Sequence, residues 1–182
     1  MIVVTGPSGA GKGTLIRHLL GCLPELTVAI SATTRSRRPG EEHGRDYWFL
    51  EEVEFAKRVA AGEFLEHVTY VSGHRYGTLR SEIDRIVADG KVCVLELETE
   101  GALNVKEQIP DALTIFITAP IPELERRLRE RATESAGEIG ERIDLARLQL
   151  DQATQFDCVV LNDELGRAAG ELTGIVREAI RR

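Results

Sequence analysis

Cysteine is scarce in this sequence, and long hydrophobic runs are absent. The three cysteines, Cys22, Cys93 and Cys158, lie far apart, and their odd number leaves no disulfide framework. No apolar stretch approaches the roughly 18 residues of a membrane-spanning helix, and the apolar opening residues run directly into Gly6 rather than into a signal-peptide pattern. We therefore expect a cytoplasmic protein that works in a reducing compartment.

Positive charge is also in deficit. The chain has 23 basic residues against 30 acidic ones, a net charge of -7, whereas nucleic acids and membrane surfaces select a basic face. We therefore expect no nucleic-acid or membrane partner. Lysine supplies four of the basic residues and arginine 19, an excess that codon preference explains at least as well as anion recognition. Each arginine is therefore interpreted by its position.

The 182 residues suit one domain in which short apolar runs alternate with segments of helical period. The expected strands are nearly continuous in apolar residues, as buried parallel strands are, and comprise residues 2–5, 28–30, 92–97, 113–118 and 158–161. The expected helices comprise residues 11–23, 78–88, 99–108, 122–131, 138–155 and 165–180. This order predicts a doubly wound α/β fold, a parallel sheet flanked by helices.

Two stretches interrupt the alternation. Residues 31–77 carry alternating or aromatic segments and one helical segment at 51–60, which predicts a small mixed-strand insert. Residues 132–140 are polar and irregular between arginine-rich flanks, which makes residues 126–141 a candidate lid. Residues 1–30, 78–125 and 142–182 then form the core, and all parts form one compact unit.

A phosphate-binding loop follows the first strand. The spacing matches a known phosphate-binding motif, with four residues between Gly6 and Gly11 and with Lys12 directly after. In that motif the loop joins a strand to a helix, its backbone N–H groups surround phosphate oxygens, and the lysine reaches the outer phosphates. Chance alone would produce this spacing in roughly 5 % of such chains, but its position after a strand and before a helix favours a nucleotide site. The candidate binding residues are Gly9, Ala10, Gly11, Lys12, Gly13 and Thr14.

Further motifs follow the loop, at residues 31–41, 44–49, 62–66 and 75–78. They resemble the monophosphate-binding segment of guanylate kinases. With the loop, the lid arginines and residues 161–163, the resemblance spans essentially the whole chain. Gly13 stands where the strict loop motif has a Ser or Thr ligand for Mg²⁺. The resulting Gly-Lys-Gly-Thr resembles adenylate kinases, which implies Mg²⁺ held largely through water.

The resemblance implies that two arginines and two tyrosines bind the phosphate of the nucleoside monophosphate that accepts the phosphoryl group. Arg35 and Arg38 have planar guanidinium groups that can bind phosphate oxygens bidentately, and the hydroxyls of Tyr47 and Tyr76 can donate to the same oxygens. Without the family, the arginines would equally suit a solvated basic loop and Tyr47 a core position.

Glu66 is the residue that the resemblance assigns to the base. A carboxylate can accept both N1–H and N2–H of guanine, whereas adenine has no donor at N1 and no 2-amino group. The resemblance implies that hydroxyls at Ser31 and Thr78 complete these contacts. The alternatives are an exposed strand carboxylate for Glu66 and a helix N-cap for Thr78.

The remaining candidates are two glutamates and the residues of the donor side. Glu96 and Glu98 end a strand where ligands bind in open α/β sheets and are candidates for binding GMP. Either can also hold Mg²⁺ waters or orient an arginine, although Glu98 also suits a helix N-terminus. Lid arginines of the family match Arg127, Arg131 and Arg142, whose alternative is a solvated helix face. Asn162 resembles the residue that contacts the adenine of the donor, although Asn-Asp is also a common turn.

The resemblance implies an ATP-dependent guanylate kinase. Such an enzyme transfers the γ-phosphoryl group of ATP to GMP, and we expect dGMP to serve as well, with Mg²⁺ accompanying ATP. A kinase of ribose 1,5-bisphosphate on the same scaffold is one alternative, and Glu66 argues against it because a sugar phosphate has no purine edge. The other is a non-catalytic phosphopeptide-binding module, against which the intact loop and lid argue.

Overall fold

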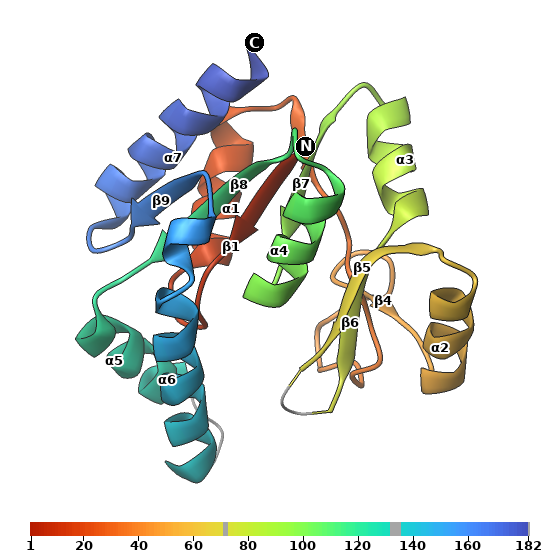
Figure 1. Ribbon diagram of the computed structural model, residues 1–182, viewed down its shortest axis with the longest axis horizontal. Helices are drawn as coiled ribbons and strands as arrows, with labels where there is room; N and C mark the ends of the chain where they lie inside the picture. Colours follow the sequence, from red (N-terminus) through yellow and green to blue (C-terminus); the bar gives the residue numbers. More distant parts are fainter. Residues whose placement is uncertain (71–72, 132–135, 182) are drawn as a thin grey trace.

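The computed structural model describes residues 1–70, 73–131 and 136–181, without the side chains of residues 131 and 136–139 (Figure 1). Five parallel strands form the central sheet in the order β2-β7-β1-β8-β9. Their bounds are Ile2–Thr5 for β1, Leu26–Val28 for β2, Val92–Glu96 for β7, Leu113–Thr118 for β8 and Cys158–Leu161 for β9. The predicted α/β fold with a parallel sheet is confirmed.

Helices cover both faces of this sheet (Figure 1). Successive side chains point to opposite faces, so Val4 packs with α1 and α7 while Val3 packs with α3 and α4. Both valines are fully buried, which explains why the strands are continuously apolar. The bounds of these helices are Lys12–Cys22 for α1, Arg80–Ala88 for α3, Thr99–Gln108 for α4 and Leu165–Ile180 for α7.

The insert forms a second sheet of four strands in the order β4-β3-β6-β5. Its elements are β3 (Ala32–Thr33), β4 (Trp48–Phe49), α2 (Glu52–Ala60), β5 (Phe64–Thr69) and β6 (Arg75–Leu79). Phe55 of α2 stacks on Phe64 of β5, with ring centroids 4.5 Å apart, and anchors the small core of this sheet. Strand β6 continues to Leu79, two residues beyond the expected end of the insert at 77.

Helices α5 (Ile121–Arg131) and α6 (Ala136–Leu150) project from the same end of the central sheet as the insert (Figure 1). The expected irregular stretch at 132–140 is therefore wrong from residue 136 onward, where α6 begins. Residues 132–135 lie outside the described part of the chain. A single 3₁₀ turn, Ala153–Gln155, links α6 to β9.

Strand β2 differs from its expected bounds. It covers Leu26–Val28 rather than residues 28–30, because Leu26, Thr27 and Val28 pair with β7. The N–H of Ile30 instead donates to Glu82 Oε1 of α3 at 3.1 Å. Across the described residues, no helix combines the length and apolar character needed to cross a membrane.

Candidate active site

A cavity of about 330 Å³ lies at the carboxyl ends of the parallel strands, between the central sheet, the insert and α6. This is where ligands bind in open α/β sheets, because loops from neighbouring strands diverge there. Predicted site residues that line it are Lys12, Ser31, Tyr47, Glu66, Tyr76, Glu96, Glu98 and Arg142. The fold therefore brings together residues that are spread over more than 130 positions of the chain, from 12 to 142.

The phosphate-binding loop, residues 6–14, joins β1 to α1 and borders a second, adjoining cavity of about 420 Å³. Gly11 has a φ of 89°, and a Cβ there would lie 2.4 Å from Nδ2 of Asn162, so only glycine suits the position. Lys12 Nζ donates to the carbonyl oxygens of Gly6 at 2.7 Å and Pro7 at 3.3 Å. The ammonium group is thereby held beside the loop at the start of α1.

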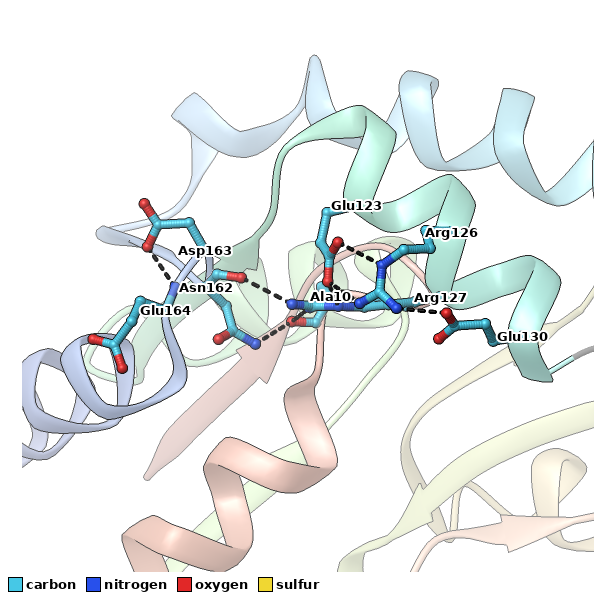
Figure 2. Close-up of polar contacts among 9 residues, drawn as sticks. Ala10, Glu123, Arg126, Arg127, Glu130, Asn162, Asp163 and Glu164 are labelled. Carbon is cyan, nitrogen blue, oxygen red and sulfur yellow. Dashed lines mark hydrogen bonds and ion pairs between the residues drawn. The ribbon is translucent and has the colours of Figure 1, made fainter.

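Two of the predicted lid arginines contact this loop. Arg127 Nη1 donates to the carbonyl oxygen of Gly9 at 3.3 Å. Its Nε donates to Glu123 at 2.7 Å, and both of these residues are labelled in Figure 2. Arg142 Nη2 donates to Ser8 Oγ at 2.7 Å. The run of arginines is thus divided, because Arg126 pairs with Glu123 and Glu130 of α5 while Arg127 also reaches the loop. The side chain of Arg131 lies outside the described residues.

Asn162 lies under the loop, where β9 ends. It is 4 % exposed, and its Nδ2 donates to the carbonyl oxygen of Ala10 at 2.7 Å (Figure 2). The backbone carbonyl oxygen of Asn162 accepts a hydrogen bond from Arg127 Nη2 at 3.3 Å. The structure therefore gives Asn162 a supporting contact with the loop, and Asn162 is absent from the walls of the 330 Å³ cavity.

Glu66 presents a buried carboxylate to the 330 Å³ cavity. It is 5 % exposed, and its Oε1 accepts a hydrogen bond from Thr78 Oγ1 at 2.9 Å. Its Oε2 lies against α4, where a Cβ on Gly101 would come within 2.6 Å, so a larger residue at 101 would displace this carboxylate. Burial raises the pKa of Glu66 to about 7, although the hydrogen bonds from Thr78 oppose the shift.

Thr78 is a strand residue rather than a helix N-cap. It lies in β6, Leu79 precedes the first residue of α3, and the Thr78 hydroxyl is used by Glu66. The N-cap alternative is therefore wrong. An irregularity in the pairing of β5 with β6 between Phe64 and Glu66 sets the register that places Glu66 opposite Thr78.

The two predicted phosphate-binding arginines differ in their surroundings. The guanidinium of Arg35 lies 5.3 Å from the ring centroid of Tyr47 and forms an ion pair with Glu41 at 2.8 Å. The side chain of Arg38 is exposed. Tyr47 and Tyr76 lie beside each other, with ring centroids 6.1 Å apart, and burial raises the pKa of Tyr47, which keeps its hydroxyl protonated and able to donate.

Glu96 and Glu98 lie at the end of β7, on the sheet side of the cavity. Desolvation by the surrounding protein raises the pKa of Glu96, even though its side chain opens to the cavity. The positive charge of Lys12 opposes that rise. Glu98 is the N-cap residue of α4 but makes no side-chain capping hydrogen bond. Its Oε2 instead accepts a contact of 3.5 Å from Nε2 of Gln149, a buried residue of α6.

Sequence reasoning did not identify four residues that the fold brings to this site. Ser8 and Gln149 contact the predicted residues Arg142 and Glu98, while Asp46 and Tyr70 line the 330 Å³ cavity. Ser8 lay inside the recognised loop, so its position was a usable signal. The polar Gln149 on the buried face of α6 was a weaker signal, because a polar residue in an amphipathic helix is ordinary unless its contacts are known.

Comparisons with known proteins agree with this geometry. The sequence model of the family described as guanylate kinase matches residues 1–179. The chain is 44 % identical to a guanylate kinase of Rubrobacter xylanophilus, over 99 % of this chain and 94 % of that protein. It is also 44 % identical to a guanylate kinase of Synechococcus elongatus, over 97 % and 96 % of the two chains.

Solved structures include a member of the same family and a more distant protein that shares the fold. The crystal structure of guanylate kinase from Anaplasma phagocytophilum is similar with a TM-score of 0.78 and 28 % identity, covering 98 % of this chain and 85 % of that one. A shikimate kinase from Bacteroides thetaiotaomicron shares the fold at a TM-score of 0.54 and 18 % identity, over 97 % of each chain. With a family match over nearly its whole length, the chain belongs to the guanylate kinase family.

Proposed function

We propose that this chain transfers the γ-phosphoryl group of ATP to GMP, giving ADP and GDP. The observation that carries the proposal is the buried Glu66 carboxylate in the cavity of about 330 Å³, which is the acceptor cavity of this proposal, with Thr78 on one oxygen and the phosphate-binding loop across the same cavity. A carboxylate that is buried with one neutral side-chain donor loses most of its hydration, and this loss costs free energy. Guanine N1–H and N2–H supply two further donors to that carboxylate, which adenine lacks.

The acceptor's phosphate is held at the Arg35 and Tyr47 end of the cavity. Arg35, Tyr47 and Tyr76 already contact one another, and Arg38 lies in the same loop as Arg35. Guanidinium and phenol donors together suit a dianionic phosphate. Because dGMP has the same base and phosphate, we propose it as a second acceptor. Ser31 lines the same cavity and completes the contacts to the base.

The donor lies over the phosphate-binding loop, whose residues 9–14 bind its phosphates through backbone N–H groups. Lys12 moves from the carbonyl oxygens of Gly6 and Pro7 onto the outer phosphates, where it neutralises charge. Arg127 and Arg142 approach the loop from α5 and α6 and stabilise the charge that spreads over the transferring group. We assign Arg131 the same role. We assign Asn162 to the binding of ATP, on the donor side of the phosphate-binding loop.

The residues around the loop fit a magnesium ion that accompanies ATP. Both carboxylate oxygens of Glu96 lie 3.9 Å from the Cβ that a residue other than Gly13 would carry, and oxygen donors of this kind are those that Mg²⁺ prefers. Among the described residues, no cluster of three or more metal-ligating side chains occurs. Glu96 and Glu98 would therefore hold the ion through its waters, and Mg²⁺ would neutralise phosphate charge.

A coupled assay of ADP release tests the proposal. The acceptors are GMP, dGMP, AMP, UMP and ribose 1,5-bisphosphate, each with ATP and Mg²⁺. We expect turnover with GMP and dGMP and at least 100-fold lower kcat/KM with AMP and UMP. Turnover with ribose 1,5-bisphosphate alone would overturn the proposal in favour of a sugar-phosphate kinase. ADP release with none of them, together with phosphopeptide binding, would favour the non-catalytic alternative.

A further inference from the structure

Glu41 holds the Arg35 guanidinium at its far end. Glu41 Oε1 accepts from Arg35 Nη2 at 2.8 Å, and Oε2 accepts from Nη1 at 3.1 Å, which is the bidentate geometry of an arginine and a carboxylate. The pair is largely enclosed, with 11 % of the Arg35 side chain and 20 % of the Glu41 side chain exposed. Glu41 is outside the set of residues that sequence reasoning assigned to the site.

The remaining contacts of Arg35 fix the direction of its unused donors. Nη1 also donates to the carbonyl oxygen of Ser36 at 2.8 Å, so Glu41 and Ser36 together occupy both hydrogens of Nη1 and one of Nη2. An arginine has five such N–H donors, and the other two, on Nε and Nη2, form its lateral edge. The pKa of Arg35 is raised chiefly by Glu41 and further by Tyr76, which lines the same cavity, so Tyr76 lies close to this guanidinium.

We infer that Glu41 is a positioning residue of the acceptor site, which holds Arg35 so that the lateral edge of its guanidinium receives the phosphate of the acceptor nucleotide. The inference rests on the proposed function. An arginine side chain that is already fixed loses little conformational entropy when it binds its ligand, which strengthens binding without a new contact. The rings of Tyr47 and Phe49, 5.3 and 5.7 Å from the guanidinium carbon, hold it from a further direction.

Glu41 could instead compete with the phosphate for Arg35, but its own anchoring argues against competition. Oε2 also accepts from the backbone N–H of Arg38 at 2.8 Å, so the fold of the loop determines where the carboxylate lies. Glu41 occupies the end of the guanidinium, and a phosphate on the lateral edge leaves that ion pair intact. The two roles predict opposite effects of removing the carboxylate: weaker GMP binding for positioning, and tighter binding for competition.

The experiment compares Glu41→Ala and Glu41→Gln with Glu42→Gln, which removes a neighbouring exposed carboxylate that pairs with Arg45. We expect Glu41→Ala to raise the KM for GMP about tenfold, with kcat and the KM for ATP within about twofold of wild type. Glu41→Gln falls between, because an amide oxygen still accepts one N–H. Glu42→Gln leaves all three constants unchanged. A KM for GMP that is unchanged or lower in Glu41→Ala would overturn the inference.

Two further measurements separate positioning from loss of structure. Guanosine binding, measured by calorimetry, lacks the phosphate contact and should be the same in Glu41→Ala and wild type, whereas a collapsed insert would weaken guanosine and GMP alike. In an Arg35→Ala background, Glu41→Ala should have no further effect on GMP binding, and additive effects would contradict action through Arg35. A wild type that binds guanosine and GMP equally well overturns this inference alone; one that binds neither overturns the proposed function as well.

Discussion

On the proposed donor side of the site, Lys12 rests on neutral oxygens of the chain itself, whereas on the proposed acceptor side the charged groups are buried or ion-paired. Lys12 donates to the carbonyl oxygens of Gly6 and Pro7. Glu66, by contrast, is buried with a raised pKa, and Arg35 is enclosed with Glu41. The same cavity therefore holds two different electrostatic designs.

The difference fits what each side has to recognise. A triphosphate is recognised by its charge, so movable cations and backbone N–H groups suffice, and these can rest on weak internal acceptors until the donor arrives. A purine base is recognised by a few hydrogen bonds, and these discriminate strongly only where an unpaired partner stays buried. We therefore expect changes on the donor side to affect turnover, and changes on the acceptor side to affect selectivity.

The largest effect is expected from Lys12→Ala. Loss of the ammonium group removes charge neutralisation from the transferring phosphoryl group, and we expect kcat to fall about 1,000-fold. GMP binding measured by calorimetry should stay within about threefold of wild type, because the acceptor contacts remain. Lys57→Ala, a change at an exposed lysine of α2, is the control. Turnover near the wild-type rate would refute the role given to Lys12.

Glu66→Gln tests the acceptor side of the comparison. The amide keeps one acceptor oxygen but turns an NH₂ group toward a guanine donor, so we expect the KM for GMP to rise roughly 100-fold. The KM for ATP should change less than threefold, because the donor lies on the other side of the cavity. The control is Glu63→Gln, which removes an exposed carboxylate paired with Arg58. Equal rises in both KM values would contradict selective base recognition.

The pH dependence of stability tests the burial of Glu66 in the absence of substrate. The pKa of Glu66 is raised from 4.5 to about 7, so the folded protein binds this proton more tightly than the unfolded chain does. The resulting stabilisation is fully present below pH 4.5 and is lost as the pH rises through 7. Relative to Glu66→Gln, the unfolding free energy of wild type should fall by about 3 kcal/mol over that range, measured by urea denaturation. Parallel pH profiles would show that Glu66 ionises freely.

The smallest effect is expected from Asn162→Ala. It removes the hydrogen bond to the Ala10 carbonyl oxygen, which supports the phosphate-binding loop. We expect the KM for ATP to rise about tenfold and the KM for GMP to change less than twofold. Asp163→Asn, a change in a surface ion pair with Arg167, is the control. If the variant instead accepts GTP as readily as ATP, Asn162 reads the donor base and does more than support the loop.

The sequence predicted the central sheet well because buried parallel strands leave a simple pattern. Strands β1, β8 and β9 and helices α4 and α7 have the expected bounds, since continuous apolar runs and helical period are local properties. Strand β2 was misplaced by two residues because its ends depend on pairing with β7, and sequence pattern alone does not contain that register.

The site was predictable where a motif places a residue in the fold and unpredictable where two distant side chains meet. The loop motif located Lys12, and the resemblance located Glu66. The contact between Gln149 and Glu98 joins α6 to the end of β7, 51 positions apart, so no local pattern announces it. Glu41 was similarly hidden, because an acidic residue in a polar loop is ordinary until its ion pair with Arg35 is seen.

The account depends most on Glu66 binding the guanine base as an anion. With a pKa of about 7, Glu66 is half protonated at pH 7 and must lose that proton when GMP binds. Calorimetric titration of GMP at pH 7 in buffers of different ionisation enthalpy measures the release directly. Wild type should release about half a proton more per GMP bound than Glu66→Gln does. Equal proton release by the two proteins would contradict base recognition by this carboxylate.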